Sequence, residues 1–251
     1  MSVKSAWLLC LLALSGVAAV PAQAELPPGY QVVLQTENFP PFNMADNDKN
    51  FARDANIQGV STTIVREMFK RAGIDYSLTL RFPWSRVYDA TLANANHGLF
   101  STSMNEARRP LFKWVGPIAK VERVLLAAPG SSIPNLTSLE QARQYRIGSY
   151  KDSAAAQALE KAGLQPNNAL RDQENIGKLT AGKIDLWGTT DPVWRYQARQ
   201  AGVSGLRNVL TFDRADLYLA LNLDTPDEVV SRLQQALDQM KTEGYGTCNK
   251  H

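Results

Sequence analysis

The stretch from Ser101 to Pro117 carries residues whose types and spacing could bind an anion. It reads S-T-S-M-N-E-A-R-R-P-L-F-K-W-V-G-P, with Ser101 and Ser103 ahead of Arg108. A guanidinium offers a rigid fork of N–H donors that fits a carboxylate bidentately, and hydroxyls with backbone N–H groups can complete the anion's shell. We therefore predict that Arg108 holds the carboxylate of a small ligand. The simpler alternative is a solvated surface arginine before an ordinary strand.

Aromatic rings follow two other predicted strands. Residues 30–35 form a short β-prone run, and the motif T-E-N-F-P-P-F then places Phe39 and Phe42 in a loop, because two consecutive prolines cannot continue a β-ladder. Residues 76–82 alternate as a second strand, which Pro83-Trp84 breaks. Rings at strand ends can form the walls of a ligand site, although they can also simply fill the core.

The order of the elements predicts that these segments meet. A third short strand at 98–101 precedes Arg108, and helices separate the strands. Such alternation implies parallel βαβ units, whose right-handed crossovers bring the carboxyl ends of the strands to one edge of the sheet. Ligands bind at that edge in open α/β sheets. The other expected elements of this half are a polar surface loop at 46–56 and a helix capped by Ser61 and ended by Gly73. A second helix, capped by Ser85, is expected to run through Asn94, and the unit is expected to end at 114–117.

A second α/β unit is expected after these elements. Ser153 lies at a predicted helix start, where free N–H groups can receive an anion, although capping is the more frequent use of such a serine. Asp191 or Thr190 precedes Pro192 and could cap the next helix, or Asp191 could contact a ligand amine. The expected strands are 121–128, 145–148, 183–187, 206–212 and 217–223, and the expected helices are 136–142, 152–162, 172–181 and 226–241.

The first 24 residues have the pattern of a cleaved signal peptide. Lys4 supplies a positive charge, an apolar core follows, and Ala22-Gln23-Ala24 gives a small-x-small cleavage site. The apolar run is short for a membrane span, and Cys10 lies inside it rather than at the cleavage point. We expect an exported protein that begins at Glu25 and, in a bacterium, resides in the periplasm.

The composition of the remaining chain excludes several classes of function. Removing one Lys from 27 Lys+Arg leaves 26 against 24 Asp+Glu, a net charge of +2, so no nucleic-acid partner is expected. Cys248 would be the sole cysteine, which precludes an intramolecular disulfide. His97 and His251 lack partners at metal-ligand spacing, so neither a metal nor another cofactor is expected.

The order of these motifs resembles the bacterial solute-binding proteins of family 3, the periplasmic receptors of polar amino-acid ABC transporters. The likeness runs from Tyr30 to Glu243 and includes G-S-Y-K-D-S and K-I-D-L-W, while P-W-S-R and F-K-W-V-G-P mark a divergent branch. It implies a periplasmic-binding-protein-like α/β fold of type II, with two α/β lobes joined by two hinge crossovers. Lobe one would comprise residues 25–120 plus 213–251, and lobe two residues 121–212.

The resemblance also implies roles for individual residues. Arg108, with Ser101 and Ser103, would grip an α-carboxylate, and Ser153 would complete its shell. The aspartate that binds the α-amino group in the family falls at Thr190, with Asp191 one place along. The chain departs from the pattern at this position, at Asn105 in place of the Thr of T-x-x-R, and at His97. Phe39 and Trp84 match the aromatic residues that flank the ligand.

The resemblance implies a monomeric, non-enzymatic receptor that captures a small carboxylate-bearing ligand, most simply an amino acid, for an inner-membrane permease. One alternative is a sensing subunit for a membrane signalling protein. Another is an enzyme similar to the cyclohexadienyl dehydratases, for which Glu37 is the nearest carboxylate. The sequence sets neither the identity nor the charge of the ligand, and it assigns no role to Cys248.

Overall fold

The computed structural model describes residues 25–46 and 49–245. The predicted signal peptide, Cys248 and His251 lie outside these residues, as does most of the C-terminal tail. The described chain forms a mixed α/β fold with one nine-stranded sheet, in the order β3-β5-β1-β6-β11-β7-β10-β8-β9. A separate small sheet pairs β2 (Met44–Ala45) with β4 (Ile57–Gln58).

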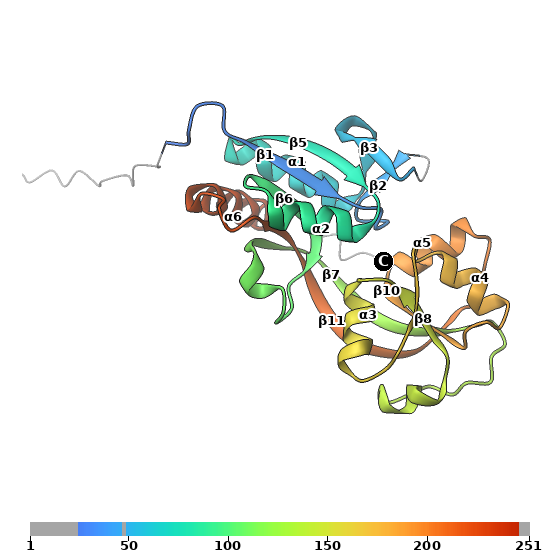
Figure 1. Cartoon of the computed structure of the whole chain (residues 1–251). Helices are drawn as coiled ribbons and strands as arrows, with labels where there is room; N and C mark the ends of the chain where they lie inside the picture. Colours follow the sequence, from blue (N-terminus) through green and yellow to red (C-terminus); the bar gives the residue numbers. More distant parts are fainter. Residues whose placement is uncertain (1–24, 47–48, 246–251) are drawn as a thin grey trace, which may run out of the picture.

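The elements gather into two groups, which we call the first and second lobes (Figure 1). The first lobe contains β1 (Gln31–Thr36), β3 (Phe51–Arg53), β5 (Asp75–Arg81), β6 (His97–Ser103), α1 (Val60–Ala72), α2 (Trp84–Ala93) and α6 (Asp227–Thr242). The second contains β8 (Ile147–Tyr150), β9 (Asn167–Ala169), β10 (Leu186–Asp191), α3 (Ala154–Lys161), α4 (Glu174–Thr180) and α5 (Val193–Gln200). Short 3-10 helices cover Asp54–Asn56, Arg109–Leu111 and Glu140–Gln144.

Two antiparallel strands of 15 residues each, β7 (Lys113–Ala127) and β11 (Arg207–Leu221), run through both lobes (Figure 1). In the first lobe β11 pairs with β6, and in the second lobe β7 pairs with β10. Because both strands continue from one lobe to the other, they are the two crossovers of a type II arrangement. The exact lobe boundaries at residues 120 and 212 stay a prediction.

Each lobe has its own apolar core. In the first lobe α1 and α6 cover one face of the sheet, with Met68, Phe69 and Leu233 completely buried, while α2 covers the other face. In the second lobe the side chains of β7 alternate between two cores, Val124 and Leu126 on one face and Leu125 and Ala127 on the other. This period of two arises because helices cover both faces of the strand.

Parallel pairing brings the predicted strand ends together. In the first lobe β1 pairs in parallel with β5 and β6, and in the second β8 pairs in parallel with β10 and β9. The carboxyl ends of β1, β5 and β6 therefore lie along one edge of the sheet, which faces the second lobe (Figure 1).

Several boundary predictions were wrong. The loop expected at 46–56 contains β3, which pairs antiparallel with β5, and the expected helix at 136–142 is the 3-10 turn Glu140–Gln144. The strands expected at 206–212 and 217–223 are one strand, β11. Residues 114–117, which were expected to end the first unit, lie in β7 together with the strand expected at 121–128. Gly116-Pro117 does not end β7, because the register shifts there and this dipeptide lies in a bulge opposite Tyr218.

Neither Ser61 nor Ser85 caps its helix. The N-cap of α1 is Gly59, whose φ is 126°, and a Cβ there would lie 2.3 Å from the carbonyl oxygen of Phe42. That carbonyl instead accepts a hydrogen bond from the backbone N–H of Ser61 at 2.8 Å. The loop after β1 that carries Phe39 and Phe42, which we call the aromatic loop, thus caps α1 through its backbone. This contact fixes the loop against the first lobe. The N-cap of α2 is Pro83.

Candidate functional site

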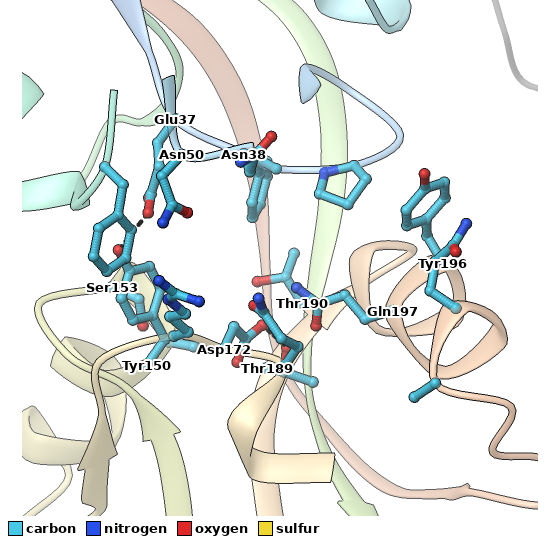
Figure 2. A pocket seen from close by; sticks show the side chains of 18 of the residues that line it. Glu37, Asn38, Asn50, Tyr150, Ser153, Asp172, Thr189, Thr190, Tyr196 and Gln197 are labelled. Carbon is cyan, nitrogen blue, oxygen red and sulfur yellow. Dashed lines mark hydrogen bonds between the residues drawn. The ribbon is translucent and has the colours of Figure 1, made fainter. Parts of the chain in front are cut away.

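Two adjacent cavities lie between the lobes and share Glu37, Phe39, Tyr150, Ser153 and Thr190 in their walls. The inner cavity has a volume of about 70 Å3, and the outer cavity (Figure 2) has a volume of about 660 Å3. The inner walls also include Thr36, Asn43, Trp84, Phe100, Ser101, Ser103, Arg108, Val121 and Arg123. The outer walls also include Asn38, Lys49, Asn50, Phe82, Arg171, Asp172, Thr189, Tyr196 and Gln197.

The structure brings most of the sequence-predicted site residues to the inner cavity: Phe39, Trp84, Ser101, Ser103, Arg108, Ser153 and Thr190. Phe42 lines neither cavity, and its ring stacks behind Phe39 with the centroids 5.6 Å apart. Asp191 also lines neither cavity, because its carboxylate accepts hydrogen bonds from Trp194 Nε1 and Arg195 Nη2, both at 2.8 Å.

Arg108 is a buried cation that lacks a carboxylate partner within the described chain. Its side chain lies with its guanidinium carbon 5.5 Å from the ring centroid of Trp84 and 5.3 Å from that of Tyr88. Nη2 donates to Gln157 Oε1 at 3.1 Å, across the cleft. Burial lowers the pKa of Arg108 from its usual high value, but an arginine stays charged at neutral pH. A buried, uncompensated guanidinium favours an anion beside it.

Asn105 explains how the turn before Arg108 tolerates a departure from the family pattern. The Oδ1 of Asn105 accepts a hydrogen bond from the backbone N–H of Arg108 at 2.9 Å. Asn and Thr can both satisfy a backbone donor two or three residues later. The substitution therefore preserves the turn that directs Arg108 into the cleft.

Ser101 is directed into the inner cavity by a bulge in β6. The pairing with β11 passes from Phe100 to Thr102 and leaves Ser101 without a partner, and its φ is 60°, a strained value for a residue with a side chain. Its hydroxyl donates to Asn43 Oδ1. Asn43 in turn donates to Thr36 Oγ1 at 2.7 Å, so this buried amide, which sequence reasoning missed, ties the ends of β1 and β6 together.

Ser153 does cap α3, because its Oγ accepts a hydrogen bond from Ala156 N at 3.1 Å. Its hydroxyl oxygen is used as an acceptor there, which leaves the hydroxyl hydrogen available to a ligand. The alternative role as a cap thus does not remove Ser153 from the cavity walls.

Glu37 is a buried acid whose position the sequence left open. Its Oε1 accepts a 2.6 Å hydrogen bond from Tyr150 Oη. Tyr150 Oη in turn accepts a 3.0 Å hydrogen bond from Trp84 N. Burial raises the pKa of Glu37 to about 8, although the bond from Tyr150 opposes this shift. The same burial raises the pKa of Tyr150. Because Tyr150 belongs to β8 and Glu37 follows β1, this hydrogen bond joins the two lobes.

Asp172 is a second acid in the cleft that sequence reasoning missed. Its two oxygens accept from Trp187 Nε1 at 2.9 Å and Thr189 Oγ1 at 2.7 Å. Loss of hydration raises the pKa of Asp172 to about 6, despite these bonds. An aspartate before a helix resembles an ordinary cap in sequence, so its position in a cavity was not predictable.

Arg123 is the second guanidinium of the inner cavity. It lies on β7, is 5% exposed and forms an ion pair with Asp213 of β11. Burial, with the charge of Arg108 nearby, lowers the pKa of Arg123 to about 10, which still leaves the group charged at neutral pH. Nothing in the β-prone pattern V-E-R-V distinguishes this arginine from an exposed one.

Among the described residues, no group of three or more His, Cys, Asp or Glu side chains is arranged to hold a metal ion. None of the helices in this part of the chain is long and apolar enough to span a membrane.

Two α/β lobes, two crossover strands and a polar cleft between the lobes define a two-lobed binding protein of the periplasmic-binding-protein-like class. The chain belongs to the bacterial extracellular solute-binding proteins, family 3, whose family model matches residues 32–247. A search of curated proteins finds no match.

Solved structures of low sequence identity share this fold. An ancestral arginine-binding protein bound to arginine is 20% identical with a TM-score of 0.72, and the match covers 86% of this chain and 94% of that one. ArtJ of Geobacillus stearothermophilus, which binds arginine, lysine and histidine, is 19% identical with a TM-score of 0.73, and the match covers 86% of this chain and 92% of that one. A histidine kinase sensor domain with similarity to periplasmic binding proteins is 18% identical with a TM-score of 0.74, and the match covers 85% of this chain and 91% of that one.

Proposed function

We propose that the protein is a periplasmic receptor that captures a small carboxylate-bearing solute, most simply an amino acid, and passes it to an inner-membrane permease. The observation that supports this most directly is Arg108, a buried guanidinium with no carboxylate partner among the described residues, at the wall of an interlobe cavity. Ser101 and Ser103 supply hydroxyls beside it. The N-terminal pattern supports export to the periplasm.

Ligand binding would couple to closure of the lobes. Side-chain contacts that cross the cleft include Tyr150 with Glu37, Arg108 with Gln157 at 3.1 Å, and Lys161 with Glu106 at 2.6 Å. A ligand that touches both lobes gains more contacts in the closed form and therefore favours it. In this proposal Arg108 and Trp84 hold the ligand from the first lobe, and Ser153 and Thr190 hold it from the second.

The test begins with a thermal-shift screen of amino acids, small organic acids and polyamines, followed by calorimetry on the best ligand. Arg108→Gln should weaken binding by at least about 30-fold, because a buried charge-assisted pair loses about 2–5 kcal/mol when one partner is removed. Arg109→Gln is the matched control, since Arg109 is adjacent and exposed. Unchanged affinity in Arg108→Gln would show that the carboxylate is held elsewhere.

A sensing role is the second candidate, and the likeness to a histidine kinase sensor domain supports it. A receptor for signalling and a receptor for transport share the same ligand site but differ in the membrane protein they contact. Cross-linking in membranes of the native host, with and without ligand, separates the two: a permease recovered as partner supports transport, and a kinase supports sensing.

The enzymatic alternative is supported by one observation. The raised pKa of Glu37 keeps its carboxyl protonated at neutral pH beside the rings of Phe39 and Tyr150, as a general acid would require. Prephenate turnover by the purified protein, lost in Glu37→Gln, would favour this candidate over a receptor.

A further inference from the structure

We propose that Glu37 and Asp172 together bind a positively charged nitrogen of the ligand, and so supply the negative charge that the family pattern would place at Thr190. This inference rests on the proposed capture of a carboxylate-bearing solute through Arg108. It names a second recognition element in the same cleft, made of two residues to which the resemblance assigns no contact with the ligand.

The two carboxyls approach one cavity from opposite lobes. Glu37 follows β1 in the first lobe, Asp172 lies between β9 and α4 in the second, and both line the outer cavity. Figure 2 shows Glu37 above the cavity and Asp172 below it. They are the only acidic residues in the described walls of either cavity. A cation between them would therefore contact both lobes.

Neither carboxyl has an ion-pair partner within the described chain. Glu37 accepts from the hydroxyl of Tyr150. Asp172 accepts from Thr189 and Trp187 and is also hydrogen-bonded by the side chains of Asn175 and Gln197. All of these donors are neutral. Asp191, the other acid near Thr190, already forms an ion pair with Arg195. A buried or half-buried carboxylate without a cation is costly, so a ligand cation would stabilise the ionised form of both acids.

Gln197 supports the position of Asp172 in the cavity wall. It lines the outer cavity and its side chain hydrogen-bonds Asp172, while its own Oε1 is completely enclosed and therefore out of reach of a ligand. An ammonium has three N–H donors and a guanidinium has five, so either could bond to both carboxyls at once.

The charges of the cleft fit a dipolar ligand. Arg108 lies at the inner cavity, and the acidic pair lies at the outer one. Because the pKa of Asp172 is raised to about 6 and that of Glu37 to about 8, the empty pair holds about one proton at pH 7. A cation bound there lowers the pKa of Glu37 and releases that proton. The other charged or titratable groups in these walls are Tyr150, Tyr196, Lys49 and Arg171 in the outer cavity and Arg108 and Arg123 in the inner one.

The experiment uses calorimetry at pH 7 with three compounds on one scaffold: L-arginine, L-citrulline, which lacks the side-chain charge, and L-argininic acid, in which a hydroxyl replaces the α-amino group. We expect L-arginine to bind at least about tenfold more tightly than one of the two analogues. Glu37→Gln should reduce the ratio between the affinities for L-arginine and for that analogue to about one. Titrations in two buffers of different ionisation enthalpy should show proton release on binding, which Glu37→Gln abolishes.

The controls separate this inference from the proposed function. Glu106→Gln, at an exposed acid that pairs with Lys161, should change neither the ratio nor the proton release. Asp172→Asn should act as Glu37→Gln does; Glu37→Gln is decisive if Asp172→Asn does not fold, because glutamine matches the shape of the protonated acid. Equal affinity for the three compounds overturns the inference, and so does a failure of all three to bind. If a different carboxylate binds and depends on Arg108, the proposed function survives that result.

Discussion

The hydroxyl of Tyr150 offers the sharpest test of how the lobes are held together, through the variant Tyr150→Phe. That oxygen donates to Glu37 Oε1 at 2.6 Å and accepts from Trp84 N at 3.0 Å. Both partners belong to the first lobe, while Tyr150 belongs to the second. The two hydrogen bonds therefore require the contact between the lobes that this structure has, and we expect their loss to favour a more open arrangement.

The magnitude follows from the number of bonds. An intramolecular hydrogen bond contributes about 0.5–1.5 kcal/mol net, so two of them contribute about 2 kcal/mol, which corresponds to about a 30-fold shift toward the open form. Phenylalanine keeps the ring and its contacts, so the second lobe should unfold at an unchanged urea concentration. The pKa of Glu37 should rise further, because the bond from Tyr150 lowers it.

The shift is measurable as a distance between spin labels placed one on each lobe. Lys70→Cys on α1 and Glu174→Cys on α4 are exposed labelling positions, in a Cys248→Ser background. Tyr145→Phe is the matched control, since Tyr145 packs inside the second lobe alone. An unchanged distribution of distances in Tyr150→Phe, or an equal effect of Tyr145→Phe, would refute the reasoning.

Two further predictions concern pH and the backbone. Burial in this structure raises the pKa of Glu37 from 4.5 to about 8. We expect opening of the lobes to hydrate Glu37; contact between the lobes then binds a proton between these values, and the stabilisation that this proton gives is complete below pH 4.5 and is lost as the pH rises through 8. The spin-label distances should show this opening, and Glu37→Gln should abolish the pH dependence. Gly59→Ala should lower the free energy of unfolding by about 2 kcal/mol or more, because φ is positive and a Cβ would collide with Phe42 O. Gly177→Ala, in α4 with open space around its Cα, should instead raise it by about 0.5–1 kcal/mol in urea titrations.

The part of the site that followed from sequence is the part that depends on strand order. Trp84, Ser101 and Arg108 lie beside one cavity because the parallel strands before them end at one edge of the sheet. Glu37 was noted only as the nearest carboxylate for an enzyme. Asp172 and Arg123 were missed, since an acid before a helix and an arginine in a strand have many ordinary roles.

The boundaries that failed share a physical cause. Gly116-Pro117 and residues 213–216 contain turn formers or charges that favour a break in a strand. In the structure, register shifts absorb the irregularity and β7 and β11 continue through both lobes. The predicted caps Ser61 and Ser85 failed because a backbone carbonyl of the aromatic loop and a proline occupy the helix starts.

The sequence by itself determined the family, the α/β class and the identity of the principal cation, because these depend on local order along the chain. Only the tertiary structure decided the electrostatics of the cleft. The charge state of Glu37, the hydrogen bonds of Asp172 and the isolation of Arg108 from any carboxylate in the described chain all depend on which groups exclude water from them. Residues from distant segments and both lobes set that exclusion, and spacing along the chain does not record it.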